Sequence, residues 1–302
     1  MASREGNDMS SELIDFIGLG VMGEPMCRNL HQRSGRRVLA FDLRPEPLQR
    51  LAADGVEAAQ TPGELAGKCD VVFVSMPSGK ELTALAHDGN GLLQHARAGQ
   101  VVVDLGTSPV SLTRELAAAF AERGAAYLDA PVARTRQAAE SGTLAVMVGG
   151  DVAVLETVRP LMACFASDIT HCGGVGSGQV TKILNNMVLF QTVTALSEAY
   201  AIARGAGVDP GVLFDALSKG SADSFALRNH GMKAILPRQF PLRAFPVSYA
   251  KKDLEYALEL AADAGIDAAG ARNVLRLFGQ AIDAGVGDAY FPVVSRILTG
   301  EI

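Results

Sequence analysis

The chain has 302 residues, of which 48% are hydrophobic and 20% are charged, and its formal net charge is −6 at pH 7. This length favours about two domains, and this composition is typical of a folded protein with a full hydrophobic core. The acidic balance and the lack of a basic face argue against nucleic acid as a partner. No apolar run reaches the ~18 residues of a membrane span, so we expect no membrane partner and a cytoplasmic protein.

The chain offers little for metal or disulfide chemistry. Its four cysteines show no C-x-x-C pairing, which indicates reduced thiols. Its five histidines are scattered without the spacing of metal ligands, so we expect no metal. Residues 1–10 are polar and lack the apolar core of a signal peptide, which predicts a flexible tail.

A strand-to-helix turn near the N-terminus carries the first functional motif. An apolar run at 13–17 is typical of a short strand, and apolar residues recur after it at helical spacing. Between them, Gly18, Gly20 and Gly23 form the pattern G-x-G-x-x-G, which is typical of a turn that binds the pyrophosphate of a dinucleotide. A glycine-rich turn without a ligand is the alternative. The predicted cofactor-binding residues of this turn are Gly18, Leu19, Gly20, Val21, Met22 and Gly23.

An acidic residue closes the next predicted strand, at 38–41. Asp42 follows the glycines at about 20 residues, the spacing of a carboxylate that accepts both ribose hydroxyls of NAD. Its charge would repel the 2′-phosphate of NADP, so NAD is the predicted cofactor. Arg44, two residues later, keeps NADP as the alternative.

Strands alternate with helices up to about residue 172. Valine-rich runs at 71–74 and 101–105 indicate a parallel sheet that is buried on both faces. Ligands bind beyond the carboxyl ends of such strands, where Met76, Pro77 and Thr107 follow. The alternative is that these are only turn residues. The other predicted elements are helices at 45–54 and 110–123 and strands at 127–129, 145–148 and 168–171.

The composition changes at the glycine-rich stretch 173–178. A long helix without proline is predicted from 179 to about 204, and the rest of the chain is helical almost throughout. The predicted fold is therefore an α/β Rossmann-type N-terminal domain, residues 11–173, followed by an all-α domain for substrate and oligomer contacts, residues 174–302, joined by the long helix. An apolar helical domain of this kind predicts a homodimer or homotetramer.

Three basic residues are candidates for chemistry. Lys182 and Asn186 lie four residues apart on one face of the long helix, with Asn185 beside them, so an amine held by amides could move the proton of a hydroxyl group. A lysine that extends its amine into solvent is the alternative. For Lys252, a solvated surface charge is the expected role without further context. Arg134 follows a predicted strand end, where it could bind an anion bidentately or serve as a surface charge or oligomer contact.

At these residues the sequence resembles the β-hydroxyacid dehydrogenase family, the group that contains 3-hydroxyisobutyrate dehydrogenase, tartronate semialdehyde reductase and 6-phosphogluconate dehydrogenase. Four ordered segments spread over nearly the whole chain carry the resemblance. They are a cofactor signature at 16–26, a substrate signature at 129–132 with 142–144, a catalytic signature ending in K-x-x-N-N at 173–186, and a late lysine motif at 252–254.

The resemblance implies roles for individual residues. It implies that Lys182 is the general acid/base and that Asn186, with Asn185, orients the amine and the substrate. It also implies that Lys252 approaches the nicotinamide. The cofactor-lining residues that it implies are Met76, Pro77, Thr107 and Lys252.

One segment departs from the family pattern. Family members usually follow D-A-P-V with Ser-Gly-Gly, whereas this chain has Ala133, Arg134 and Thr135. Here it resembles the sulfolactaldehyde and succinic semialdehyde reductase branch, and a guanidinium at this place implies a sulfonate or a more distant carboxylate. Leu189, one turn after Asn185, differs from the sulfonate enzymes and implies a more apolar pocket. The predicted substrate-binding residues are Pro131, Val132, Ala133, Arg134, Thr135, Asn185 and Leu189.

The resemblance thus implies an NAD-dependent oxidoreductase that interconverts a small anionic β-hydroxyacid or ω-hydroxyacid and its semialdehyde or ketone. The alternatives are a catalytically silent NAD(P)-binding scaffold module and an imine reductase-like enzyme. Family relatives with either property replace the catalytic lysine, so the presence of Lys182 argues against both.

Overall fold

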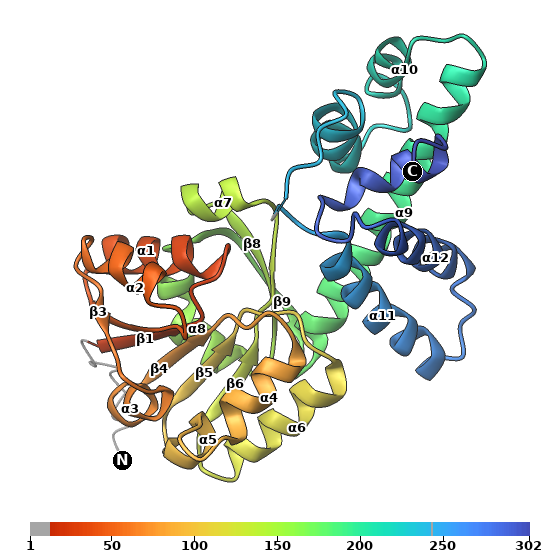
Figure 1. The fold of residues 1–302 in the computed structure, drawn as a ribbon. Coiled ribbons are helices and arrows are strands. Elements are labelled where there is room, and N and C mark those ends of the chain that lie inside the picture. The colour runs from red at the N-terminus through yellow and green to blue at the C-terminus, as the bar shows by residue number, and fades with distance from the viewer. Residues whose placement is uncertain (1–12, 243) are drawn as a thin grey trace. The chain divides into compact units, whose positions relative to one another are not determined.

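The computed structural model describes residues 13–242 and 244–302, so the predicted tail at 1–10 lies outside the described residues. The chain divides into two compact units, Met1–Lys182 and Ile183–Ile302. Figure 1 shows an α/β sheet structure in the first unit and helices in the second. The predicted fold class, a Rossmann-type domain followed by a helical domain, is confirmed.

The first unit is built on one sheet with the strand order β3-β2-β1-β4-β5-β6-β8-β7, and β9 pairs with β8. Strands β1 to β6 pair in parallel, as the valine-rich runs predict. Their carboxyl ends therefore lie along one edge of the sheet. These strands are β1 (Leu13–Ile17), β2 (Arg37–Phe41), β3 (Glu57–Ala58), β4 (Val71–Val74), β5 (Val101–Asp104) and β6 (Ala126–Asp129).

The end of the sheet beyond β6 contains antiparallel strand pairs that the sequence did not predict. Strand β8 (Leu144–Gly149) runs antiparallel to β6 and to β7 (Val132–Ala133), and β9 (Ala166–Gly173) runs parallel to β8. Only residues 134–143 separate β7 from β8, a connection too short for the parallel crossover of a dozen or more residues. Both β8 and β9 are longer than the predicted strands.

Helices cover both faces of this sheet, with α1 and α8 on one face and α4 and α6 on the other (Figure 1). Side chains of Thr61, Ser78 and Asp151 accept backbone amides where α3, α4 and α8 begin. The predicted helices at 45–54 and 110–123 end earlier than expected. The helices are α1 (Gly23–Ser34), α2 (Pro45–Ala52), α3 (Pro62–Lys68), α4 (Gly79–His87), α5 (Leu92–His95), α6 (Val110–Ala121), α7 (Arg136–Ser141) and α8 (Val152–Met162).

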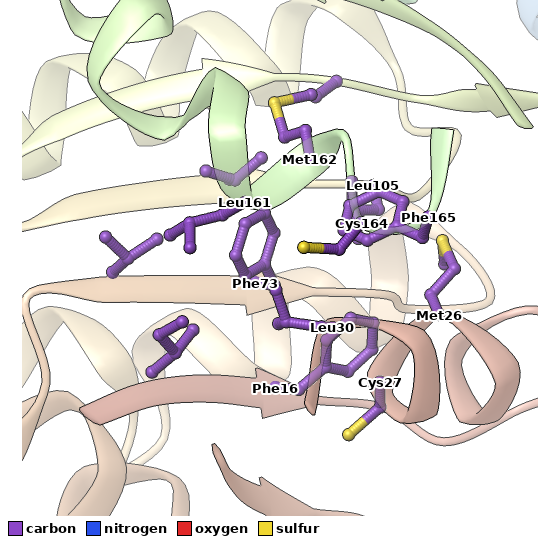
Figure 2. Packing of buried hydrophobic residues seen from close by; sticks show 14 of the residues in the cluster. Phe16, Met26, Cys27, Leu30, Phe73, Leu105, Leu161, Met162, Cys164 and Phe165 are labelled. Carbon is purple, nitrogen blue, oxygen red and sulfur yellow. The ribbon is translucent and has the colours of Figure 1, made fainter. Parts of the chain in front are cut away.

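Aromatic rings form the centre of the larger core of this unit (Figure 2). The ring of Phe73 on β4 stacks on Phe16 of β1 at 6.1 Å between centroids and meets Phe165 edge-on at 5.7 Å. All three side chains are fully buried. Burial of this size contributes roughly 1.5–3 kcal/mol for each large side chain, so the strands that end at the candidate site are firmly held.

The second unit consists of helices packed around another aromatic core. The ring of Phe190 lies 5.1 to 5.8 Å from the rings of Phe245, Phe278 and Phe291. Helix α9 (Ser177–Gly205) begins in the first unit and continues into the second, and it starts slightly before the predicted helix. The remaining elements are α10 (Pro210–Leu217), a π-helix η1 (Leu227–Ile235), α11 (Val247–Asp263), α12 (Ala269–Asp283), a 3₁₀ turn η2 (Phe291–Val293) and α13 (Val294–Leu298).

Across residues 13–242 and 244–302, no helix combines the length and the apolar character needed to cross a bilayer.

Candidate active site

The glycine turn joins β1 to α1 and leaves an open stretch of backbone. Gly18 has φ +91°, and a Cβ there would lie 2.3 Å from the Ser75 carbonyl oxygen. A Cβ on Gly23 would lie 1.9 Å from the Gly18 carbonyl oxygen, so only glycine fits at both places. Around Gly20, in contrast, no described atom comes within 4 Å of a built Cβ. The turn therefore has the open approach that a pyrophosphate needs in front of the first turn of α1.

Asp42 lies at the end of β2 and contacts this turn directly. Its carboxylate accepts the backbone N–H of Leu19 at 2.7 Å and that of Arg44 at 2.9 Å. The guanidinium of Arg44 pairs with the same carboxylate at 3.1 Å and donates to the Leu19 carbonyl oxygen at 3.2 Å. Burial opposes ionisation of Asp42, but the hydrogen bonds from Arg44 and Leu19 outweigh it and hold the pKa of Asp42 below its usual value.

The loops that follow β4 and β5 pack beside the glycine turn. A Cβ on Gly18 would lie 2.6 Å from the Cε of Met76, and one on Gly106 would lie 2.9 Å from the Met76 carbonyl oxygen. Three strand ends are thus brought together, and they carry the predicted residues Met76, Pro77 and Thr107. A side chain at position 106 would collide with the backbone of Met76, which explains why this position is a glycine.

The last residue of β6 holds the start of helix α9 in place. The carboxylate of Asp129 accepts the backbone N–H groups of Gly176 and Gln179, each at 2.8 Å. Burial raises the pKa of Asp129, although these amides lower it in part. The substrate signature therefore begins with a residue that caps α9. Pro131 and Val132 follow it directly.

In the structure, the guanidinium of Arg134, which the sequence predicts to bind an anion, contacts neighbouring parts of the chain. Its side chain donates to the Thr143 carbonyl oxygen at 2.6 Å and to the Ser167 hydroxyl at 2.9 Å. It also forms an ion pair with Asp168 of β9 at 2.7 Å. These contacts tie β9 to the ends of the β7–β8 connection. Thr135 caps α7 by accepting the Ala138 amide.

The two asparagines of the K-x-x-N-N motif on α9 belong to a series of hydrogen bonds. Lys182 is partly buried and Asn186 is 1% exposed, and they lie four residues apart on this helix. The amide of Asn185 donates to the Asn186 side-chain oxygen at 3.1 Å, and Asn186 donates to Asp253 of α11 at 2.7 Å. Leu189, the last predicted residue of this helix, is partly buried.

Lys252 is held by its neighbours and is not a solvated surface charge. Its Nζ lies 3.1 Å from the carboxylate of Asp253, and its side chain is 19% exposed. The amine also lies over the rings of Tyr249 and Tyr256, at 4.7 and 5.2 Å from their centroids. Asp253 therefore links Lys252 of α11 to Asn186 of α9, and the sequence-based expectation for Lys252 alone is wrong.

Several polar residues of the site were missed. Asp253 is adjacent to Lys252 in the K-D-L motif, and this position could have identified it as a residue of the site. Gln179 and Asp104 are both fully or almost fully buried among strand ends and the start of α9. The acid Asp104 at the end of a run of valines signals a buried partner, but it does not identify that partner.

Comparison with known proteins agrees with this geometry. Residues 13–174 match a family model described as the NAD binding domain of 6-phosphogluconate dehydrogenase. Residues 176–297 match one described as NAD-binding of NADP-dependent 3-hydroxyisobutyrate dehydrogenase. The chain belongs to the β-hydroxyacid dehydrogenase family.

Individual members of the β-hydroxyacid dehydrogenase family match over most of their length. A 2-hydroxy-3-oxopropionate reductase of Escherichia coli is 36% identical over 82% of this chain and 84% of its own. An NAD-dependent L-serine dehydrogenase of Pseudomonas aeruginosa is 32% identical over 94% and 97%. Among solved structures, a 3-hydroxyisobutyrate dehydrogenase of Mycobacterium tuberculosis with L-serine has a TM-score of 0.86 at 31% identity, and the match covers 95% of this chain and 98% of the other.

Membership of this β-hydroxyacid dehydrogenase family means that the chain has nicotinamide-cofactor-binding domains. The open backbone at Gly20 and the carboxylate of Asp42 beside Leu19 fit the pyrophosphate and ribose of such a cofactor. No group of three or more histidine, cysteine or acidic residues suited to a metal ion occurs in the described part of the chain.

Proposed function

We propose that this protein is an NAD-dependent dehydrogenase that interconverts a small anionic β-hydroxyacid or ω-hydroxyacid and its semialdehyde or ketone. The observation that carries this proposal is the motif K-x-x-N-N on α9, in which Asn186 is buried and fixed by Asp253. The motif keeps Lys182, which relatives that have lost catalysis replace, so it favours the enzyme over the scaffold alternative.

Lys182 is the proposed general acid/base. As a base, its amine accepts the hydroxyl proton of the hydroxyacid, and in the reverse direction its ammonium donates a proton to the alkoxide oxygen. When bound, the nicotinamide cofactor accepts or supplies the hydride. Asn186 and Asn185 orient the reacting oxygen and the amine, and Lys252 lies near the nicotinamide. Pro131, Val132 and Leu189 are proposed to line the substrate.

The preference for NAD rests on Asp42. Its ionised carboxylate beside the Leu19 amide would accept a ribose hydroxyl and repel a 2′-phosphate. Arg44 is paired with that same carboxylate, which supports NAD because the guanidinium is already engaged. A 2′-phosphate would have to compete with Asp42 for Arg44.

The substrate class follows from the Pro131–Thr135 segment. Because Arg134 pairs with Asp168, its guanidinium is a weaker argument for a sulfonate substrate than the sequence alone implies. We therefore propose a small carboxylate of the kind that relatives named for serine and hydroxyisobutyrate use. The anion would contact polar atoms near Ala133 and Thr135.

The test is a substrate panel read by NADH absorbance. L-serine, 3-hydroxyisobutyrate, tartronate semialdehyde, succinic semialdehyde and sulfolactaldehyde are each offered with NAD(H) and with NADP(H). We expect turnover of at least one with NAD(H), which Lys182→Ala abolishes and Lys251→Ala retains. Tight NADH binding without turnover of any compound would instead support the scaffold alternative. Full turnover by Lys182→Ala would remove the lysine from proton transfer.

A further inference from the structure

Gln179 occupies a buried position in the first turn of α9, within the first unit. Its side chain is fully buried. The amide nitrogen donates to the Gly106 carbonyl oxygen at 2.9 Å, and the amide oxygen accepts the backbone N–H of Ser108 at 3.1 Å. These two contacts grip the backbone on either side of Thr107. One side chain thus joins the loop after β5 to the start of the helix that carries Lys182.

The start of α9 is itself held against the sheet with no spare room. Asp129 binds the amide of Gln179 and that of Gly176, as described above. A Cβ on Gly178 would lie 2.4 Å from the Met147 carbonyl oxygen and 2.6 Å from that of Asp129. The helix backbone therefore packs directly on the strand ends, and the direction of the Gln179 side chain is determined by the fold.

A second carboxylate completes the arrangement. Asp104 is the register partner of Asp129 on the neighbouring strand, and both are fully buried. Asp104 accepts the Gly106 amide at 2.9 Å and the Tyr127 hydroxyl at 3.1 Å. Its second oxygen also lies 3.5 Å from the Gln179 amide nitrogen. The loop that carries Thr107 is therefore attached at its base to β5 and at its far side to α9.

We infer that Gln179 is a positioning residue for the proposed reaction, because it fixes the Thr107 loop and the Lys182 helix at one distance from each other. Lys182 lies three positions after Gln179 along α9, which is less than one helical turn. A loosened contact at Gln179 would let the loop that lines the cofactor shift against the amine. A displacement of about 1 Å in such a constellation can lower a rate about 100-fold. The inference rests on the proposed function for its catalytic meaning.

The primary test compares two variants of buried glutamines in the full chain. Gln179→Met removes both hydrogen bonds at similar volume. Gln100→Met is the matched control, because Gln100 is 1% exposed and its amide donates to Ala66 and Cys69, at the opposite end of β5. We expect Gln179→Met to lower kcat about 10- to 100-fold with KM and NADH affinity within about threefold. The control should keep kcat.

Amide hydrogen exchange gives a readout that needs neither substrate nor cofactor. In Gln179→Met, the amides of 106–108 and those of the first turns of α9 should exchange faster, whereas in Gln100→Met they should not. Unchanged exchange at 106–108, or an equal loss of kcat in both variants, would overturn the inference. If the wild-type chain turns over no compound of the panel, the proposed function fails, and the exchange result still decides whether Gln179 joins the two segments.

Gln179→Glu supplies a rescue experiment. A protonated glutamic acid can replace the donor to Gly106 and the acceptor for Ser108, whereas the carboxylate can only accept. The titratable groups around this position are Asp104 on β5 and Tyr127 and Asp129 on β6, with Arg114 of α6 beside Gly176. We expect the kcat of the variant to approach that of wild type as pH falls and to drop as it rises, relative to wild type at each pH. A pH-independent ratio would count against the inference.

Discussion

Asn186 of α9 donates a hydrogen bond of 2.7 Å to the carboxylate of Asp253 on α11, and both side chains are buried. The residues are 67 positions apart in the chain. Because Lys252 lies 3.1 Å from the same carboxylate, this one acid positions the amide of the catalytic signature and the lysine of the late motif. Its removal should therefore affect both stability and turnover.

Asp253→Ala should destabilise the second unit by about 3 kcal/mol, since it removes a buried carboxylate that accepts from the Asn186 amide and pairs with the Lys252 ammonium. It should also lower kcat, because Asn186 is no longer fixed. Urea unfolding followed by circular dichroism measures the first effect. Asp263→Ala, at an exposed position of the same helix, is the control and should change stability by less than about 0.5 kcal/mol. Equal stability of the two variants would contradict the assigned role of Asp253.

Arg134 offers a test of backbone conformation. Its φ is +87°, a left-handed value that costs a non-glycine residue roughly 1–2 kcal/mol. Arg134→Gly and Arg134→Ala both lose the contact with Asp168, but only glycine relieves this cost. We therefore expect the glycine variant to be the more stable of the two by about 1 kcal/mol in thermal or urea unfolding.

Arg134→Ala also tests whether this side chain binds the substrate. Because the guanidinium is engaged by Asp168, Arg134→Ala should weaken turnover of anionic and neutral hydroxy compounds to a similar degree. Asp168→Asn should reproduce part of the effect. A selective loss of anionic substrates would show instead that the guanidinium binds the substrate, as the sequence alone implies.

Cofactor preference should change at Asp42. Asp42→Asn removes the charge that repels a 2′-phosphate and frees Arg44 from its ion pair. We expect kcat/KM with NAD to fall about 10- to 100-fold, which corresponds to the loss of one charged hydrogen bond of roughly 1.5–3 kcal/mol. The value with NADP should rise. Arg44→Ala keeps Asp42. If this variant used NADP better than the wild type does, the role assigned to Asp42 would be wrong.

A buried acid on β1 should make stability depend on pH. Burial raises the pKa of Asp15 to about 7, although the thiol of Cys69 and the charges of Lys68 and Arg97 lower it in part. Between the ordinary value of 3.8 and about 7, the unfolded chain releases the proton before the folded chain does. The folded state then binds more protons, so the contribution of Asp15 to the free energy of unfolding falls as pH rises through this window and is constant above it.

Asp15→Asn removes this titration. Relative to wild type, the variant should therefore gain stability between about pH 5 and pH 8, whatever its absolute stability. Urea unfolding at both pH values measures the difference. Parallel pH profiles of wild type and Asp15→Asn would contradict the raised pKa.

Local patterns predicted much of the fold and the cofactor turn. The glycines, Asp42 and the valine-rich strands are each recognised within a short segment, because each reflects a local backbone requirement that the residue type itself reveals. The K-x-x-N-N spacing is likewise a property of one helix. For the same reason the long helix was predicted nearly to its ends, at Ser177 and Gly205.

The missed features depend on partners that are distant in sequence. Gln179 meets Gly106 across 73 residues, and Arg134 meets Asp168 across 34. No periodicity reports such a pair, because each residue alone is compatible with a surface position. The strand at β8 was predicted, but its antiparallel direction was missed for a related reason, since strand direction follows from the length of a connection whose helix α7 was not recognised.

The pairing of β5 with β6 places Asp104 opposite Asp129 in the sheet register. Because side chains alternate between faces along a strand, a slip of one residue would turn one of these acids to the other face. The same hydrogen-bonded ladder that completes the sheet thus also aligns the acids beneath Gln179. A form of this unit with a shifted strand register, or with partly unfolded strands, would lose this alignment of the two acids although its sequence is unchanged. The fraction of correctly folded protein can therefore be followed by measuring turnover.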